Sequence, residues 1–237
     1  MALKVLGISA SPRAGGNTDI LLAEALRGAR EAGAEVESVF LRGLTIGPCT
    51  ECYACAKTGV CRIEDDYQKV FTKMLEADRL VFATPVFFMS VSAQAKLLID
   101  RCQCLWSRKY LLKQPLFSGG PRDRRALVIA VGATRSKKMF ESVRLTMKYF
   151  FDAAGFGYFA NLFVSGVDAA GAVRTIPQAL TEALRLGQAL VAEAAMPAQP
   201  ETVELSGSPD LPTGQAGSPR ASPDADVGDR LRGGRDG

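Results

Sequence analysis

Short apolar runs alternate with amphipathic stretches over the first 195 residues of the chain. Runs of strand length occur at 3–8, 36–41, 80–83, 126–131 and 159–164. Apolar residues with helical spacing occur at 20–32, 65–77, 93–105, 140–153 and 176–195. Strands that alternate with helices are typical of a parallel sheet covered on both faces. The pattern therefore predicts one α/β domain over residues 1–195 with a five-stranded parallel sheet.

The composition changes at Met196. From there to residue 237 the chain has no aromatic residue and no lysine, and it holds half of the 12 prolines. A segment of this kind buries too little apolar surface to offset the entropy lost on ordering. We therefore expect residues 196–237 to form a disordered C-terminal tail that the fold does not need.

Composition and charge narrow the possible functions. The net charge of +4 is weak evidence for a polyanionic partner, so we expect no nucleic-acid binding. The absence of histidine excludes Ser-His-Asp and Cys-His catalysis. No apolar stretch has the length of a membrane span, and the first residues do not resemble a signal peptide. We expect a cytoplasmic protein that is not bound to a membrane.

A loop rich in serine and glycine follows the first apolar run and precedes the first helix. Backbone N–H groups at a helix N-terminus, together with the helix dipole, form an anion site. The loop matches neither of the glycine motifs of P-loop and dinucleotide-binding proteins. It indicates a phosphate site, or else an ordinary capped turn between a strand and a helix. The side chains that can add donors or charge are Ser9, Ser11, Arg13, Asn17 and Thr18.

Four of the six cysteines fall within thirteen residues, with the spacing C-x2-C-x2-C-x5-C: Cys49, Cys52, Cys55 and Cys61. Thiolates this close together can converge on one centre that accepts sulfur ligands. Such short spacings are typical of [4Fe-4S] loops, whereas structural zinc usually takes two separated Cys-x2-Cys pairs. The run favours a [4Fe-4S] cluster, with a zinc site or free redox-active thiols as the alternatives.

Three motifs together resemble one known family. The loop at 9–18 is similar to the phosphate loop of the NADPH-dependent FMN reductase superfamily. The run 84–89, followed by Lys96, Asp100 and Arg101, resembles the second flavin loop of that superfamily. The cysteine run with the acidic pair at 65–66 is similar to its iron-sulfur flavoprotein branch. The resemblance covers residues 1 to about 190 and implies a flavodoxin-like three-layer sandwich with strand order 2-1-3-4-5.

The resemblance also implies two cofactors and their ligands. The five polar residues of the first loop would bind the phosphate of FMN, and the four clustered cysteines would bind the [4Fe-4S] cluster. The flavin ring would contact Pro85, Val86, Phe87, Phe88 and Met89. Each of the last three can instead be a core residue, since they follow a buried strand.

Four further positions lie on the predicted helix at 93–105. Lys96 and Asp100 are four residues apart, which also suits a surface ion pair. Cys102 and Cys104 are two apart on one predicted helix, so we expect them to point to different faces and to pack as small apolar residues.

The family resemblance implies an FMN- and [4Fe-4S]-containing oxidoreductase. It would transfer electrons between a reduced donor, ferredoxin or NAD(P)H, and an acceptor, and it needs no catalytic side chain. One alternative is an NAD(P)H-dependent FMN or quinone reductase without a cluster. Another is a non-enzymatic anion-binding module stapled by zinc. Members of the superfamily are commonly dimers or tetramers, so we expect a homo-oligomer.

Residues 106–124 interrupt the alternation of strands and helices and predict a connecting loop with an exposed basic edge. Such an edge can steer an acidic redox partner, or it can be an ordinary solvated surface. The basic residues in and next to this stretch are Arg108, Lys109, Lys113, Arg122, Arg124 and Arg125.

Overall fold

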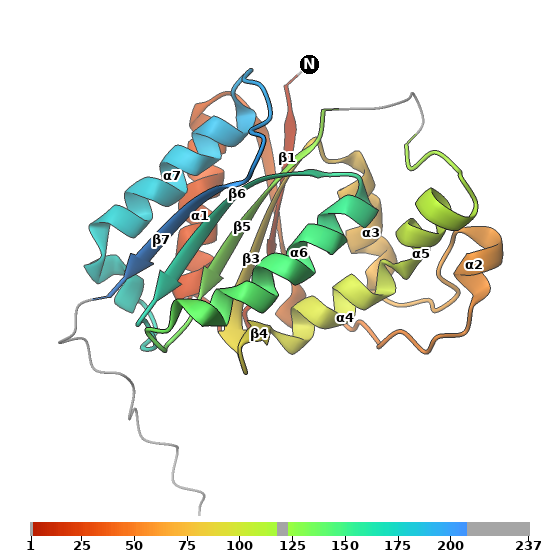
Figure 1. Ribbon diagram of the computed structural model, residues 1–237, viewed down its shortest axis with the longest axis horizontal. Coiled ribbons are helices and arrows are strands. Elements are labelled where there is room, and N and C mark those ends of the chain that lie inside the picture. Colours follow the sequence, from red (N-terminus) through yellow and green to blue (C-terminus); the bar gives the residue numbers. More distant parts are fainter. Residues whose placement is uncertain (1, 118–122, 208–237) are drawn as a thin grey trace, which may run out of the picture.

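A twisted parallel sheet covered by helices on both faces forms the domain (Figure 1). The computed structural model describes residues 2–117 and 123–207. Arg122 and residues 208–237 of the predicted tail lie outside the described residues. The strands run in the order β2-β1-β3-β5-β6-β7, and β4 pairs antiparallel with β3. None of the described helices is long and apolar enough to cross a membrane.

The bounds of the elements follow the predicted pattern closely. The strands are β1 (Lys4–Ser9), β2 (Glu35–Phe40), β3 (Arg79–Phe87), β4 (Ser90–Val91), β5 (Arg125–Val131), β6 (Gly157–Ser165) and β7 (Glu201–Ser206). The helices are α1 (Asn17–Glu31), α2 (Ala54–Thr58), α3 (Tyr67–Glu76), α4 (Ala93–Arg101), α5 (Gln103–Trp106), α6 (Glu141–Ala154) and α7 (Pro177–Val191).

The prediction of a parallel α/β sheet is confirmed, but the predicted number of strands is too small. The five expected strands are β1, β2, β3, β5 and β6, and they lie in the expected order. The sheet has seven strands, because β4 and β7 are added. A strand of two residues such as β4 leaves no periodic signal. β7 lies inside a polar, proline-containing segment whose overall composition hides it.

The disorder expected from Met196 onward is therefore wrong for residues 201–206. β7 pairs in parallel with β6 along its whole length, from Ala160 opposite Glu201 to Ser165 opposite Ser206. Val203 and Leu205 alternate along β7 and pack against the core shared by α1 and α7. Alternating apolar residues on an edge strand are enough to bury one face of it.

Two cores lie on opposite faces of the sheet. Along β3, Leu80 and Phe82 pack against α3, α4, α5 and α6, whereas Val81 and Ala83 pack against α1 and α7. This follows from the alternation of side chains along a strand that is buried on both faces. Figure 1 shows α1 and α7 side by side over one face and α6 and α4 over the other.

Helices α1 and α7 pack with their backbones in contact. A Cβ atom built on Gly187 would lie 1.9 Å from the carbonyl oxygen of Ala25, and one on Gly28 would lie 2.1 Å from that of Leu184. Neither position admits a side chain, so the two glycines set the distance between these helices.

The basic edge predicted for residues 106–124 is only partly present. Residues 107–111 form a π-helical turn. Arg124 and Arg125 are 3% and 5% exposed, which contradicts a role for them in steering a partner. Arg124 donates to the carbonyl oxygens of Ala77 and Ala154, and Arg125 to that of Ala192. These carbonyls lie at the ends of α3, α6 and α7, where helices leave acceptors without partners.

The contribution of β7 can be tested by truncation. A chain that ends at Ala195 loses the pairing with β6 and exposes the apolar side of that strand. We expect destabilisation of about 2 kcal/mol or more, and a melting temperature lower by at least about 4 °C. The measurement is thermal unfolding, with a chain that ends at Gly207 as the matched control. Equal melting temperatures for the two truncated chains would show that β7 does not stabilise the domain.

Candidate functional site

A cavity of about 140 Å³ opens at the carboxyl ends of β1, β3, β5 and β6. Ligands of open α/β sheets bind at this edge, where the loops after the strands meet. Seven of the ten residues predicted to contact flavin line the cavity: Ser11, Arg13, Asn17, Thr18, Pro85, Val86 and Phe87. The fold thus brings the two predicted flavin loops together, although they are about seventy residues apart in the chain.

Ser9 lies behind this cavity and shapes the first loop. Its side chain is fully buried, and its hydroxyl donates to Oδ1 of Asp19 at 2.5 Å. The same hydroxyl accepts from the backbone N–H of Ser11. Asp19 also accepts from the N–H of Gly15 at 2.8 Å and pairs with Arg42 at 3.0 Å. Asp19 therefore organises the loop, and the only sequence signal for it was an acidic residue in the first helical turn.

Arg13 and Asn17 connect the first loop to the loop after β6. Nη1 of Arg13 donates to the carbonyl oxygen of Asp168 at 3.1 Å, and Nδ2 of Asn17 donates to that of Ala169 at 2.9 Å. Oδ1 of Asn17 accepts from the N–H of Val173. Both side chains thus hold the two loops together, and that of Arg13 is 62% exposed.

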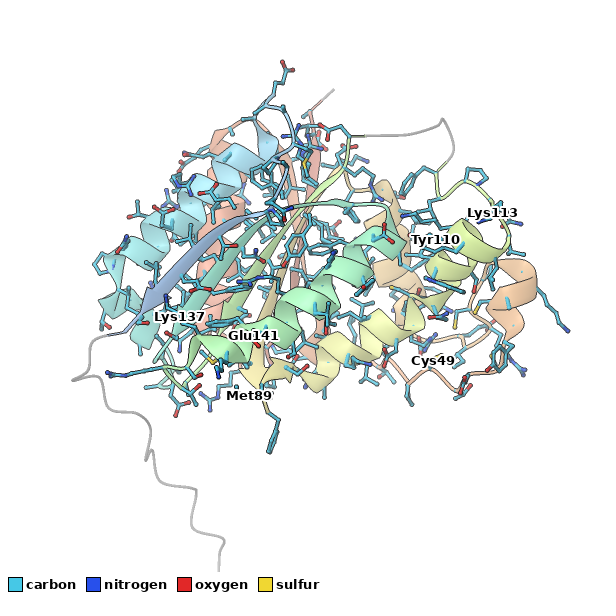
Figure 2. All side chains as sticks on the ribbon, viewed as in Figure 1. Cys49, Met89, Tyr110, Lys113, Lys137 and Glu141 are labelled. Atoms are coloured by element: carbon cyan, nitrogen blue, oxygen red, sulfur yellow. The ribbon has the colours of Figure 1, made fainter. Side chains whose placement is uncertain are left out.

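The turn between β3 and β4 separates the predicted ring contacts into two groups. Pro85, Val86 and Phe87 line the cavity. Phe88 and Met89 have φ values of 48° and 61° and do not line it, and Phe88 is fully exposed. Positive φ is uncommon for residues other than glycine and is found where a turn is held by its surroundings. Figure 2 shows Met89 at the same edge of the molecule as Lys137 and Glu141.

All four clustered cysteines line a second, larger cavity of about 640 Å³. Its opposite walls come from α4, α5 and α6, and include Trp106, Tyr149 and Phe150. Figure 2 shows Cys49 on the loop that carries α2, away from the edge that holds Met89. The two cavities share no lining residue, so the cysteine site and the proposed flavin site are separate within one chain.

The four sulfur atoms surround this cavity without converging on a point. Cys49 and Cys52 are exposed, and Cys55 and Cys61 are half-buried. Within residues 2–117 and 123–207, no group of three or more histidine, cysteine or acidic side chains is placed to hold a single metal ion. A zinc ion needs its thiolates about 2.3 Å from one centre, whereas a cluster spreads them over several irons.

The donors around the sulfurs suit an anionic cluster. Nε of Arg101 donates to Sγ of Cys61 at 3.2 Å, and Oγ of Ser107 donates to Sγ of Cys55 at 3.7 Å. Hydrogen bonds to the sulfur ligands are a regular feature of iron-sulfur sites. The four thiols and these donors therefore fit the chemistry of a [4Fe-4S] cluster.

Arg101 belongs to the motif that resembles a flavin loop, yet its side chain lies at the cysteine loop. Its Nη1 donates to Oδ2 of Asp65 at 2.7 Å, and the same oxygen accepts from the N–H of Gly47 at 2.9 Å. Burial alone would raise the pKa of Asp65, but these bonds and the N–H of Tyr67 hold that pKa below its ordinary value. The sequence singled out Asp65 only as part of the acidic pair next to the cysteine run. In the structure it accepts this ion pair and also the N–H of Tyr67 at the start of α3.

Cys102 and Cys104 are both buried, as expected, but they do not point to different faces. Their sulfurs both contact the hydroxyl of Tyr67, at 3.7 and 3.1 Å. The expectation failed because α4 ends at Arg101 and a new helix begins at Gln103, so the two cysteines do not share one helix. Burial raises the pKa of both thiols.

Residues 3–167 match the sequence profile of the family described as NADPH-dependent FMN reductase. The chain belongs to this family. Its match covers the cysteine run and the two loops predicted to bind flavin, which are the three motifs on which the resemblance was based. The family membership and the position of the cavity, at the carboxyl ends of the strands, both agree with the predicted flavin site.

Two relatives are named as iron-sulfur flavoproteins. The chain is 40% identical over 135 residues to one from Methanocaldococcus jannaschii, which covers 56% of this chain and 64% of that protein. It is 37% identical over 125 residues to one from Methanosarcina thermophila, covering 51% and 65%. The chain thus spans slightly less than two thirds of the length of these curated relatives.

A solved structure confirms the fold class. The NAD(P)H:quinone oxidoreductase from Methanothermobacter marburgensis aligns with a TM-score of 0.64 and 19% identity, over 82% of this chain and 99% of that one. At this identity the likeness establishes the flavodoxin-like α/β arrangement and carries no statement about activity.

The exposure of the six cysteines predicts how they react in the metal-free protein. The thiolate is the reactive form, so a raised pKa and burial both slow modification. We expect a thiol reagent to modify Cys49 and Cys52 first, and Cys102 and Cys104 only after unfolding. Peptide mass spectrometry over time would follow each site. Modification of Cys102 as fast as Cys49 in the folded protein would contradict the burial of Cys102.

Proposed function

We propose that the protein is a flavin-dependent oxidoreductase that holds FMN and a [4Fe-4S] cluster. It would transfer electrons between a reduced donor, ferredoxin or NAD(P)H, and an acceptor. The observation that carries the proposal is that four cysteines line one cavity in a chain of the FMN reductase family. The names of the two relatives support the same assignment.

The first loop supplies the groups that a phosphate needs. The N-terminus of α1, which begins at Asn17, presents N–H groups without intrahelical partners, and the helix dipole favours an anion there. Arg13 adds an exposed positive charge and Ser11 a hydroxyl, both at the cavity. These residues would hold the phosphate of FMN, with Ser9 and Asp19 fixing the shape of the loop.

The end of β3 supplies the apolar wall. Pro85 and Val86, near the end of β3, line the cavity together with Val131, the last residue of β5, and Val167 from the loop after β6. Apolar side chains here would orient the flavin ring and exclude water from one of its faces. When bound, FMN supplies one- and two-electron redox chemistry, which is why no side chain is assigned a catalytic role.

Cys49, Cys52, Cys55 and Cys61 would each give one thiolate to the cluster. In the described part of the chain all six cysteines are free, which suits the reducing cytoplasm. We propose that the protein works there, without nucleic acid or membrane, as a homo-oligomer.

The second candidate function is an NAD(P)H-dependent FMN or quinone reductase without a cluster. The observation in its favour is that the cysteines of the described chain form no preassembled metal group. The third candidate is a zinc-stapled module that binds an anion and has no enzymatic activity. Iron, zinc and flavin content, measured on one anaerobically reconstituted preparation, separate the three.

The first loop should govern FMN affinity. Arg13→Ala combined with Ser11→Ala removes a charge and a hydroxyl, and losing a hydrogen bond to a charged group costs on the order of 1.5–3 kcal/mol. We expect the Kd for FMN to rise about tenfold or more. Fluorescence titration of the apoprotein measures it. Arg27→Ala, which alters a surface arginine paired with Glu24 and Glu31, is the matched control. An unchanged Kd in the double variant would remove the loop from the FMN site.

The cluster should depend on Cys55 while the flavin does not. Cys55→Ala leaves three thiolates, so we expect the iron content of the reconstituted protein to fall to a small fraction of the wild-type value. FMN content should stay the same, because no cysteine lines the flavin cavity. Iron analysis and flavin absorbance on one preparation measure both. Cys104→Ala is the matched control, since that buried cysteine does not line the cysteine cavity. Full iron occupancy in Cys55→Ala would rule out Cys55 as a ligand.

A further inference from the structure

Arg101 is a fully enclosed cation beside the cysteine cavity. Its side chain is 0% exposed, and its guanidinium stacks over the ring of Tyr67 at 4.6 Å. Removing a charge from water is costly unless partners replace the lost hydration. The partners of this guanidinium therefore indicate what the charge does in the fold.

Three of the bonds that Arg101 makes hold the cysteine loop at both of its ends. Its Nη1 donates to the carbonyl oxygen of Gly47 at 3.0 Å, just before the first cysteine of the run. Its Nη2 donates to that of Ile63 at 2.8 Å, just after the last one. The ion pair with Asp65 adds a third anchor. One planar fork thus fixes the chain entering and leaving the run.

A fourth bond reaches a cysteine of the run itself. The Nε–H group points at Sγ of Cys61 at 3.2 Å. A cluster gains one electron and no proton on reduction, so its net negative charge increases by one. Hydrogen bonds to the ligand sulfurs, and positive charge nearby, stabilise the reduced form and raise the reduction potential.

We propose that Arg101 is a positioning residue that raises the reduction potential of the cluster through its Nε–H bond to Cys61 and its buried charge. The inference rests on the proposed function, because it requires that the four cysteines hold a cluster. It goes beyond that function in assigning a residue outside the cysteine run to the control of electron flow.

A substitution at Asp65 should shift the reduction potential in the direction opposite to that of a substitution at Arg101. Its carboxylate compensates the guanidinium charge at 2.7 Å. Asp65→Asn keeps an oxygen that can accept from Arg101 but removes the negative charge, so the field at the cluster becomes more positive. The reduction potential should then rise. A residue that only anchors the loop would give no such pair of opposite shifts.

The experiment compares reconstituted wild-type protein with Arg101→Met, Asp65→Asn and a control, Arg124→Met. Arg124 is a buried arginine whose bonds run to the carbonyls of Met74, Ala77 and Ala154, outside the cysteine loop. The readouts are iron and sulfide per chain, and the midpoint potential of the cluster from a redox titration followed by electron paramagnetic resonance. Thermal unfolding reports the structural cost of each change.

We expect Arg101→Met to lower the potential by about a tenfold change in the one-electron reduction equilibrium, or roughly 59 mV. Asp65→Asn should raise it, and Arg124→Met should reduce stability without moving it. Equal potentials in Arg101→Met and the wild type, or shifts of the same sign in Arg101→Met and Asp65→Asn, would overturn the inference.

Two further outcomes are also decisive. If Arg101→Met assembles no cluster, the Asp65→Asn potential decides alone, and a value equal to or below that of the wild type refutes the inference. If wild-type protein reconstituted anaerobically contains no iron, the proposed function itself fails, before any variant is compared.

Discussion

Parallel pairing of β1 with β3 is the constraint on which the proposed flavin site depends. It places Ser9, the last residue of β1, opposite Ala83, so the first loop leaves the sheet beside the last residues of β3. The N–H of Ala10 then bonds to the carbonyl oxygen of Ala83, and Oγ of Ser92 bonds to the carbonyl oxygen of Ala10. Two loops distant in sequence are thereby locked together, because the carboxyl ends of parallel strands share one edge.

Buried arginines make a second set of connections in this fold, between side chains and the backbone carbonyls of helices and loops. Arg79, Arg124 and Arg125 extend from the starts of β3 and β5 or just before them, and satisfy carbonyls near the ends of helices. Arg101 does the same for the irregular cysteine loop, where no secondary structure satisfies the backbone. A guanidinium suits this task because it carries five donors in one plane and remains charged when buried. The domain thus uses buried cations where helices and loops leave acceptors without partners.

The cysteine loop makes contacts that residue types and spacing alone did not predict. The spacing of the run identified four thiols that can share one centre, and the structure gathers them around one cavity. It did not predict that Trp106 and Tyr149 would form the opposite wall, or that Arg101 would donate to Cys61. Those contacts join α4, α5 and α6 to a loop some forty to one hundred residues away. Such pairings depend on how the helices pack, which local pattern does not encode.

The sequence by itself determined the alternation of strands and helices and the anion-binding loop after the first strand, because these follow from periodicity and from local residue types. The strand order and the second loop at the cavity came from the resemblance of the motifs to a known family. Tertiary structure decided the rest. It recruited residues 201–206 as an edge strand because β6 offered an unpaired edge, and it turned Ser9 away from the cavity toward Asp19. Burial of Arg124 and Arg125 likewise followed from the carbonyls they reach, because a charge enters a core only where the fold supplies its partners.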